Sequence, residues 1–222
     1  MFQLIQFFLS QKWEVYFGTT ALKNENSIHF TSLGVKEYAL KLNDQSFDEL
    51  IKAIDPTLVL FDRFMTEEQF GWRVATACPD AMRILDTEDL HCLRKIRKEA
   101  LKKEVVFHRD QLLYSDITKR EIAAIYRSDL SLVISSYEMN LLKECFQIKS
   151  SLLCYLPFFL DTISKKDQDN WNSYEERQHF ISIGNFLHAP NVDATIILKN
   201  TLWKLIKKQL LNAELHVYGA YP

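Results

Sequence analysis

The sequence predicts an α/β protein built on a doubly wound parallel sheet, and three observations support that fold class. Short apolar runs alternate with stretches of helical periodicity along most of the chain. Five glycines and five prolines are few for an all-β protein of 222 residues, which would need many tight turns. A hydrophobic share of 47% is enough to form a substantial packed core.

The charge balance and the cysteines narrow the class of protein further. Lysine and arginine number 27 against 29 acidic residues, giving a net charge of -2, so we expect no nucleic-acid partner. The cysteines are too far apart in sequence for a metal or redox motif, which favours reduced thiols in a cytoplasmic protein. They are Cys78, Cys92, Cys145 and Cys154.

The apolar first residues predict a helix that faces the core. Gln3 and Gln6 interrupt the run, and no basic segment precedes it, so it fits neither a signal peptide nor a membrane span. An amphipathic helix lying on a membrane surface is the alternative. Residues 13–18 and 34–42 then predict the first two strands.

The next segments predict strands that alternate with helices. A helix from Ser46 must end before Pro56, since a residue that precedes proline avoids helical geometry. Residues 57–61 are apolar without interruption, which predicts a strand in the middle of a parallel sheet. The alternation of predicted strands and helices then continues to residue 160. The remaining predicted segments are a helix at 66–79, a strand at 81–85, a basic helix at 90–103, a helix opened by a capping box at Thr118–Glu121, a strand at 130–134, a helix at 137–146 and a strand at 152–156.

The last part of the chain predicts a linker and a single βαβ unit. Residues 161–177 are charged and lack apolar periodicity, as in a linker between domains. Strands at 179–184 and 214–219 flank a helix at 191–209. Two parallel strands are stable only within a larger covered sheet, so we expect this unit to be the opening of a second domain.

Candidate site residues follow the predicted strands, because ligands of open α/β sheets bind beyond the carboxyl ends of the strands. Asp62 and Arg63 follow one strand, the acidic turn of residues 86–89 follows the next, and Ser135 follows a third. Asp86, Glu88 and Asp89 are therefore candidates for binding hydroxyl groups or accepting a proton. The same turn also fits a helix start, where carboxylates gain about 0.3 to 1 kcal/mol from the macrodipole.

A second candidate site is the loop after the strand at 179–184. Gly184 and Asn185 lie between this strand and a helix start, where backbone amides can bind a phosphate, and His188 lies in the same loop. The three spaced glycines of a dinucleotide site are absent. His91 has no second ligand at metal-binding spacing, so we expect no metal site. The basic helix at 90–103 fits a solvated face better than a phosphate-binding surface.

Two stretches resemble GT-B fold glycosyltransferases, most closely bacterial glycosyltransferase family 4-like proteins. Residues 2–6, followed by Trp13-Glu-Val, resemble the first helix and second strand of the acceptor domain, where members have a G-W-x-V strand. Residues 180–193 and 213–219 resemble the start of the donor domain. The resemblance covers nearly the whole chain.

The resemblance implies a domain layout with departures from the family. Residues 1–160 correspond to a Rossmann-like acceptor domain without its first strand and glycine-rich loop. Residues 178–222 correspond to the start of a nucleotide-sugar-binding domain, without the later basic residues and glutamate pair. We therefore expect a chain truncated at both ends. Many members carry a histidine where this sequence has the acidic turn at 86–89.

The resemblance also implies a function. Its members are retaining enzymes that move a sugar from a nucleotide sugar to a saccharide or lipid-linked acceptor, as in cell envelope polysaccharide biosynthesis. The nucleotide sugar is a substrate, and no metal or other cofactor is implied. The chain alone is expected to be inactive, with a complementing polypeptide and peripheral contact with the inner membrane as further expectations. The alternatives are a non-catalytic α/β module that docks a partner and a sugar or nucleotide epimerase of the same architecture.

Overall fold

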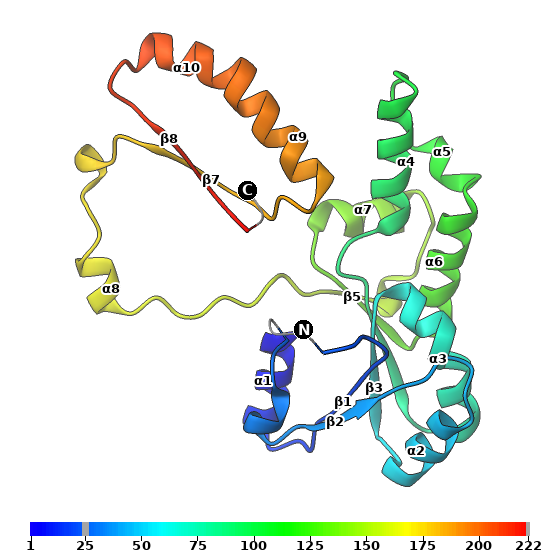
Figure 1. The fold of residues 1–222 in the computed structure, drawn as a ribbon. Helices are drawn as coiled ribbons and strands as arrows, with labels where there is room; N and C mark the ends of the chain where they lie inside the picture. Colours follow the sequence, from blue (N-terminus) through cyan, green and yellow to red (C-terminus); the bar gives the residue numbers. More distant parts are fainter. Residues whose placement is uncertain (24–26, 221–222) are drawn as a thin grey trace. The chain divides into compact units, whose positions relative to one another are not determined.

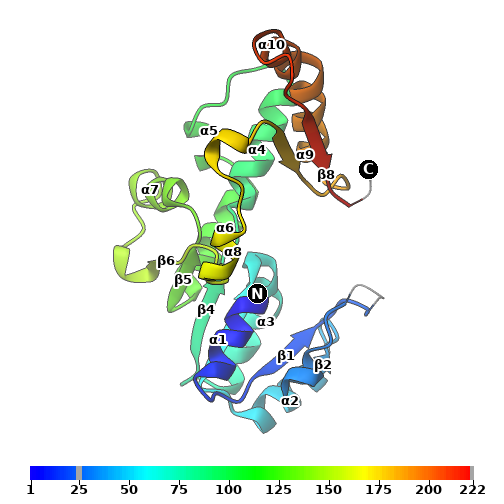
Figure 2. The same ribbon diagram turned by 90° about the vertical axis from the view of Figure 1, so that its left-hand side faces the viewer.

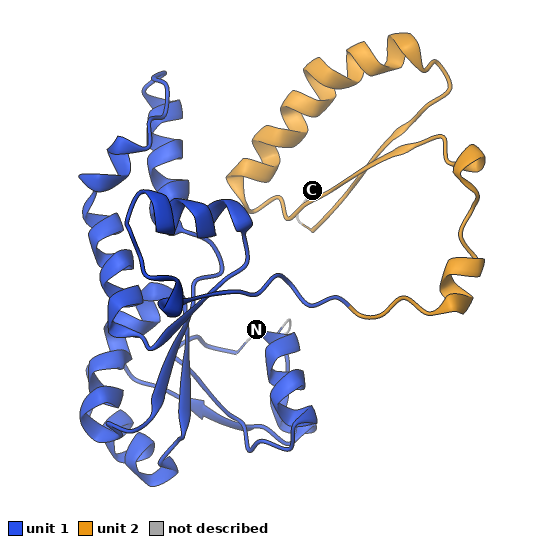
Figure 3. Cartoon of the chain, turned by 180° about the vertical axis from the view of Figure 1, so that it is seen from behind, with its two compact units in different colours: residues 1–160 blue, residues 161–222 orange. Residues whose placement is uncertain are grey.

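A computed structural model describes residues 1–23 and 27–220 and divides the chain into two compact units. Unit 1 is Met1–Leu160 and unit 2 is Asp161–Pro222, shown in different colours in Figure 3. The division falls where the predicted linker begins. No helix in the described part of the chain combines the length and the apolarity needed to cross a membrane.

Unit 1 is built on a four-stranded parallel sheet. Its strands run in sequential order: β3 (Leu58–Asp62), β4 (Met82–Asp86), β5 (Leu130–Val133) and β6 (Leu153–Tyr155). The predicted parallel α/β architecture is thereby confirmed (Figure 1).

The helices between these strands cover one face of the sheet. Crossovers between parallel strands are right-handed, so a sequential strand order places every connecting helix on the same side. Their apolar side chains fill the main core, in which Val74, Leu85, Ile125, Val133 and Leu142 are fully buried. The helices of this part are α2 (Ser46–Ile54), α3 (Arg63–Ala77), α4 (His91–Lys102), α5 (Asp110–Leu113), α6 (Asp116–Arg127) and α7 (Ser136–Glu144), with a 3-10 turn η2 (Ser150–Leu152) before β6.

The first two strands form a sheet of their own, which corrects the prediction of one sheet through residue 160. β1 (Tyr16–Thr19) pairs in parallel with β2 (Lys36–Ala39), and Figures 1 and 2 show this pair diverging from the other strands. Helix α1 (Phe2–Ser10) and the 3-10 turn η1 (Phe30–Leu33) pack on it around a separate small core of Ile5, Phe30 and Val35. These side chains form a cluster separate from the main core, and β1 and β2 correspondingly form a sheet separate from the four-stranded one.

β3 lies at an edge of its sheet, although its sequence predicted a central strand. Among the described residues it pairs only with β4. Its residues Leu58, Val59 and Leu60 are half-buried. A continuous apolar run therefore indicated a strand correctly but indicated its place in the sheet wrongly.

The predicted capping box at Thr118 and Glu121 is also wrong. Helix α6 begins earlier, at Asp116, so both residues lie inside the helix. Both are buried, with exposures of 2% and 1%. The Glu121 side chain faces another element, as described below.

Unit 2 contains the predicted βαβ unit. β7 (Phe180–Ile183) and β8 (Leu215–Tyr218) are parallel, and the helical segment between them comprises α9 (Ala189–Ile197), a π-helical turn η4 (Leu198–Leu202) and α10 (Trp203–Gln209). Phe180 packs edge-on against Trp203 with ring centroids 5.6 Å apart. The segment predicted as a linker contains two short turns, α8 (Lys165–Asp169) and η3 (Tyr174–Glu176).

Candidate functional site

The parallel register places two predicted site residues side by side at the carboxyl edge of the four-stranded sheet. Asp62 ends β3 and Asp86 ends β4, and the two are paired across the strands. The main chain then continues the ladder, since the Thr87 amide and hydroxyl both donate to the carbonyl of Leu132, at 3.1 and 2.8 Å. The acidic turn is thus fixed against β5.

Asp86 and Glu88 line a small pocket at this edge. Its volume is about 40 Å³, and its other walls are mostly apolar. They come from Met1 and α1, from β5 and the residue after it, and from the segment after β6, and Gln3 is the polar side chain among them. Those walls include Leu4, Leu132 and Phe159. A ligand entering this pocket therefore meets two carboxylates, and the N-terminal ammonium group of Met1, which also lines the pocket, acts on the pKa of both.

Burial raises the pKa of both carboxyl groups. Asp86 is 6% exposed, and this burial raises the pKa of its carboxyl group, although the Glu88 amide partly opposes the shift by donating to Asp86 Oδ1 at 3.3 Å. The pKa of Glu88 is also raised, first by burial and then by the charge of Asp62. A carboxylate with a raised pKa is a better proton acceptor than an exposed one.

Two residues at this edge have left-handed backbone conformations. Arg63 directly follows β3 with φ of 66°, and Glu88 follows β4 with φ of 53°. For residues other than glycine this conformation costs about 1 to 2 kcal/mol. Such strain collects at functional sites, where the surrounding structure holds it. The Arg63 guanidinium pairs with the Asp62 carboxylate at 2.9 and 3.2 Å.

The other predicted residues of this edge serve the local fold. Asp89 pairs with Arg94 at 3.0 Å and with His91 at 3.4 Å. Burial lowers the pKa of His91, which favours a neutral ring beside Phe64. Ser135 is the N-cap of α7, where its hydroxyl accepts the Glu138 amide at 3.4 Å.

Two buried glutamates missing from the predicted site hold the acidic turn in place. The Glu121 carboxylate accepts the amides of His91 and Cys92 at 3.0 and 2.9 Å. Glu138 accepts the Leu90 amide at 3.0 Å, and burial raises the pKa of both glutamates. They cap the start of α4 from other helices, and no local sequence signal marks a cap supplied from a distance.

In unit 2, the loop predicted to bind phosphate uses much of its hydrogen-bonding capacity internally. The Gly184 amide donates to Tyr218, and the Phe186 and His188 amides donate to Ala220 and Asn185. The Leu187 amide donates to the Asn185 side chain at 2.9 Å. These four amides already donate hydrogen bonds within unit 2, so a phosphate would have to compete with those bonds.

A close approach between the two strand ends accounts for the glycines of unit 2. A Cβ added to Gly219 would lie 1.8 Å from the Gly184 carbonyl oxygen. Gly184 itself has no left-handed φ among the described residues. Packing, rather than a phosphate-binding turn, therefore explains why small residues stand at these positions.

The structure also gathers a group that the sequence analysis missed. His179, Glu214 and His216 each offer a ligand atom, and these atoms lie within 4.8 Å of one another. The register of the structure, which pairs Phe180 with Leu215, sets the start of β7 beside the start of β8 and so brings the three residues together. Local spacing along the sequence could not show it.

Comparison with known proteins adds no assignment: the chain matches no protein-family model and no curated protein.

Proposed function

We propose that the carboxyl edge of unit 1 binds the acceptor of a glycosyl transfer reaction. The acceptor would be a saccharide or a lipid-linked saccharide, and the sugar would come from a nucleotide sugar, as the GT-B resemblance implies. The observation that carries the proposal is the pair Asp86 and Glu88, two carboxylates of raised pKa lining an otherwise mostly apolar pocket.

The chemistry of this edge suits a polyhydroxylated ligand. Carboxylates accept hydrogen bonds from sugar hydroxyls, and apolar walls such as Phe159 can pack on the carbon face of a sugar ring. The pocket itself is small, so it would take one hydroxymethyl or hydroxyl arm while the ring lies outside. In transfer, Asp86 would accept the proton of the attacking hydroxyl as the nucleoside diphosphate leaves.

The donor side of the proposal rests on unit 2. Asn185 and His188 are exposed beside Gly184 in the loop before α9. His188 directly precedes this helix, whose N-terminus favours anions. Since four loop amides are already bonded, we assign phosphate binding to these two side chains and the helix start, with electrostatic stabilisation of the leaving diphosphate.

Isothermal titration with saccharide acceptors tests the proposal. The full chain is titrated with oligosaccharides and with a short-chain lipid-diphosphate saccharide. Each charged hydrogen bond is worth about 1.5 to 3 kcal/mol, so Asp86→Asn is expected to weaken binding by about tenfold or more. Asp80→Asn, at an exposed position outside the site, is the matched control and should bind like wild type. Absence of saccharide binding, or equal loss in both variants, would contradict the proposal.

The alternative function, a module that docks another polypeptide, draws on a separate observation. β3 is an apolar strand whose outer edge is unpaired among the described residues, and such edges accept an added strand. The occupant would be an extended apolar segment running parallel to β3. If amide exchange of the full chain shows every β3 amide protected, the edge is already covered and this alternative is excluded.

A further inference from the structure

Strand register brings three metal-binding side chains together at one end of the β7–β8 pair. Phe180 pairs with Leu215, and the Phe180 amide donates to the Glu214 carbonyl at 2.9 Å. His179 immediately precedes β7, so it lies beside Glu214. Because side chains alternate along a strand, Glu214 and His216 project to the same side. Phe180, on the opposite side, packs against Trp203.

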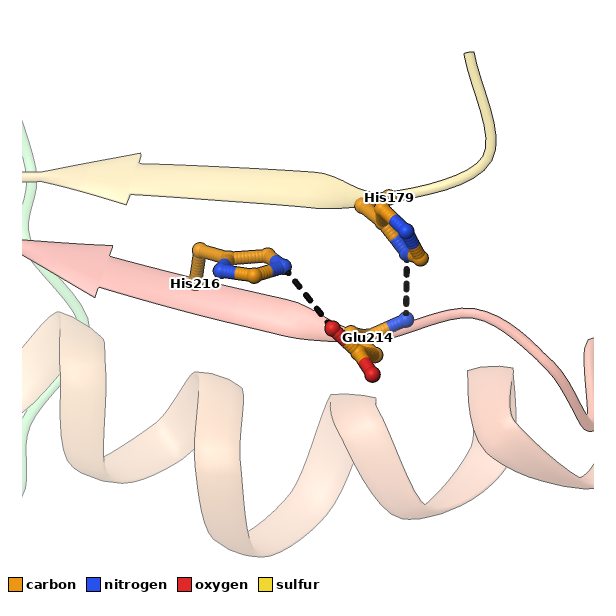
Figure 4. A group of neighbouring side chains, drawn as sticks. All are labelled: His179, Glu214 and His216. Atoms are coloured by element: carbon orange, nitrogen blue, oxygen red, sulfur yellow. Dashed lines mark hydrogen bonds and ion pairs between the residues drawn. The ribbon is translucent and has the colours of Figure 1, made fainter. Parts of the chain in front are cut away.

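The three residues already contact one another, His179 through the main-chain amide of Glu214 (Figure 4). His216 Nε2 lies 3.1 Å from Glu214 Oε2, and the Glu214 amide donates to His179 Nδ1 at 3.2 Å. The two imidazole rings are edge to face with centroids 5.4 Å apart. Glu214 and His216 retain 63% and 37% side-chain exposure, so a dissolved ion can reach them.

We propose that His179, Glu214 and His216 bind a zinc ion. Two imidazoles and one carboxylate form a ligand set that zinc takes in proteins, and a water molecule would complete a tetrahedral site. Tetrahedral ligands at about 2.0 to 2.1 Å from zinc lie roughly 3.4 Å apart. His216 Nε2 and Glu214 Oε2, at 3.1 Å, are already close to this separation. The ligand atoms of all three residues lie within 4.8 Å of one another, so exposed His179 would move towards the other two to complete the set.

Zinc binding would exchange two existing contacts for metal bonds. His216 Nε2 now lies 3.1 Å from Glu214 Oε2, and for both atoms to bind the metal the proton of this ring would stand on Nδ1. If His179 binds through Nδ1, it gives up the Glu214 amide; if it binds through Nε2, the ring proton moves to Nδ1 and that amide is again released. Zinc and protons compete for the same imidazole nitrogens. Affinity should therefore fall as the solution is made acidic.

The site would fasten the two strands of a weakly packed unit. Among the described residues of unit 2, only Ala213 is buried. Small scaffolds with little core gain stability from a metal, since metal-binding free energy adds to folding free energy. Zinc would link His179 before β7 to two residues at the start of β8. This proposal uses residues separate from the acceptor site, so its test does not depend on the acceptor proposal.

The test is titration of the metal-free full chain with zinc chloride, followed by calorimetry, and with cobalt chloride, followed by visible absorption. We expect one equivalent of zinc to bind and cobalt to give the intense absorption of a tetrahedral site. His216→Ala and Glu214→Gln should each weaken zinc binding by about tenfold or more. His108→Ala, an exposed histidine of unit 1, is the matched control and should bind like wild type.

Two results would overturn the proposal. One is no zinc binding by wild type at 0.1 mM, and the other is unchanged affinity in both His216→Ala and Glu214→Gln. Circular dichroism checks that each variant is folded. Glu214→Gln keeps the side-chain shape, so it separates loss of a ligand from loss of the fold. Zinc should also raise the thermal midpoint of wild type by more than that of His216→Ala.

Discussion

At the scale of single residues, Glu121 and Glu138 decide where the acidic turn sits. Both are buried, and together they accept the first amides of α4, at Leu90, His91 and Cys92. Helix ends leave such amides unpaired, so a buried helix start needs acceptors from elsewhere. The acceptors come from α6 and α7. The turn that carries Asp86 and Glu88 is therefore positioned by side chains of two other helices.

Glu121→Ala should destabilise unit 1 strongly. The change leaves two buried amides without acceptors and opens a cavity, which together cost about 2 to 4 kcal/mol. Urea unfolding followed by circular dichroism measures the loss. Glu99→Ala, an exposed glutamate on α4, is the control and should change stability by less than about 0.5 kcal/mol. Equal effects of the two changes would contradict the capping role.

Asp86→Asn should make the chain more stable at pH 7. Burial raises the pKa of Asp86 in the folded state, so its contribution to stability is full below about pH 4 and is lost as the pH rises through the raised value. Asparagine keeps the acceptor for the Glu88 amide and removes the titration. The stability difference should therefore shrink as the pH is lowered towards 4. Denaturant unfolding between pH 4 and 8 measures this difference, with Asp80→Asn as an exposed control. If wild type is more stable than Asp86→Asn at pH 7, this account is contradicted.

At the scale of elements, one glycine of α3 makes room for a buried carboxylate that joins this helix to α6. Glu67 on α3 is 3% exposed and binds Arg127 on α6, with a 2.9 Å bond from Arg127 Nε to Oε1. A Cβ added to Gly71, one turn later on α3, would lie 2.5 Å from Glu67 Oε1. Gly71 therefore leaves room for the carboxylate that joins the two helices.

Gly71→Ala should destabilise the chain, against the usual preference of helices for alanine. In an open helix the change stabilises by about 0.5 to 1 kcal/mol, but here it displaces the Glu67 carboxylate from Arg127. In a Glu67→Ala background the obstacle is gone and the change should stabilise. A double-mutant cycle by urea unfolding compares the two backgrounds. The same sign in both would rule out the contact with Glu67 as the cause.

The elements themselves could be predicted from the sequence because they depend on local patterns. The apolar first residues predicted α1, and the apolar runs ending at Phe61 and Leu85 predicted β3 and β4 to within a residue. Polar residues after these runs predicted the carboxyl-edge pair Asp62 and Asp86, which the register does bring together.

The relations between distant elements could not be predicted in the same way. The edge position of β3 depends on which strands pair, and a strand's own sequence does not encode its neighbours. Glu121 was mistaken for a cap of its own helix because it caps α4 across the core instead. His179 and His216 lie far apart in sequence, and only the register of β7 with β8 unites them.

At the scale of the whole molecule, the two units differ in how much core each contains. Unit 1 holds both hydrophobic clusters, whereas among the described residues of unit 2 only Ala213 is buried. Apolar side chains of the β7–β8 pair, such as Ile183, which is 79% exposed, remain in contact with solvent. Local opening should therefore be easier in unit 2.

Hydrogen exchange measured by mass spectrometry should separate the units. Amides of β4 and β5 lie in the main core and should exchange at least about a hundredfold more slowly than those of β7 and β8, a difference near 2.7 kcal/mol in opening free energy. Uniform protection across all four strands would show that unit 2 is as well packed as unit 1.

The central claim is that saccharides bind at the carboxyl edge of the four-stranded sheet, and amide chemical shifts during a saccharide titration test it most directly. With an acceptor identified by calorimetry, the account predicts that the largest shifts fall on residues 86–91 and on the end of β5, and that Asp86→Asn removes them. Shifts that leave this edge unchanged and cluster on another surface of the chain would contradict the claim.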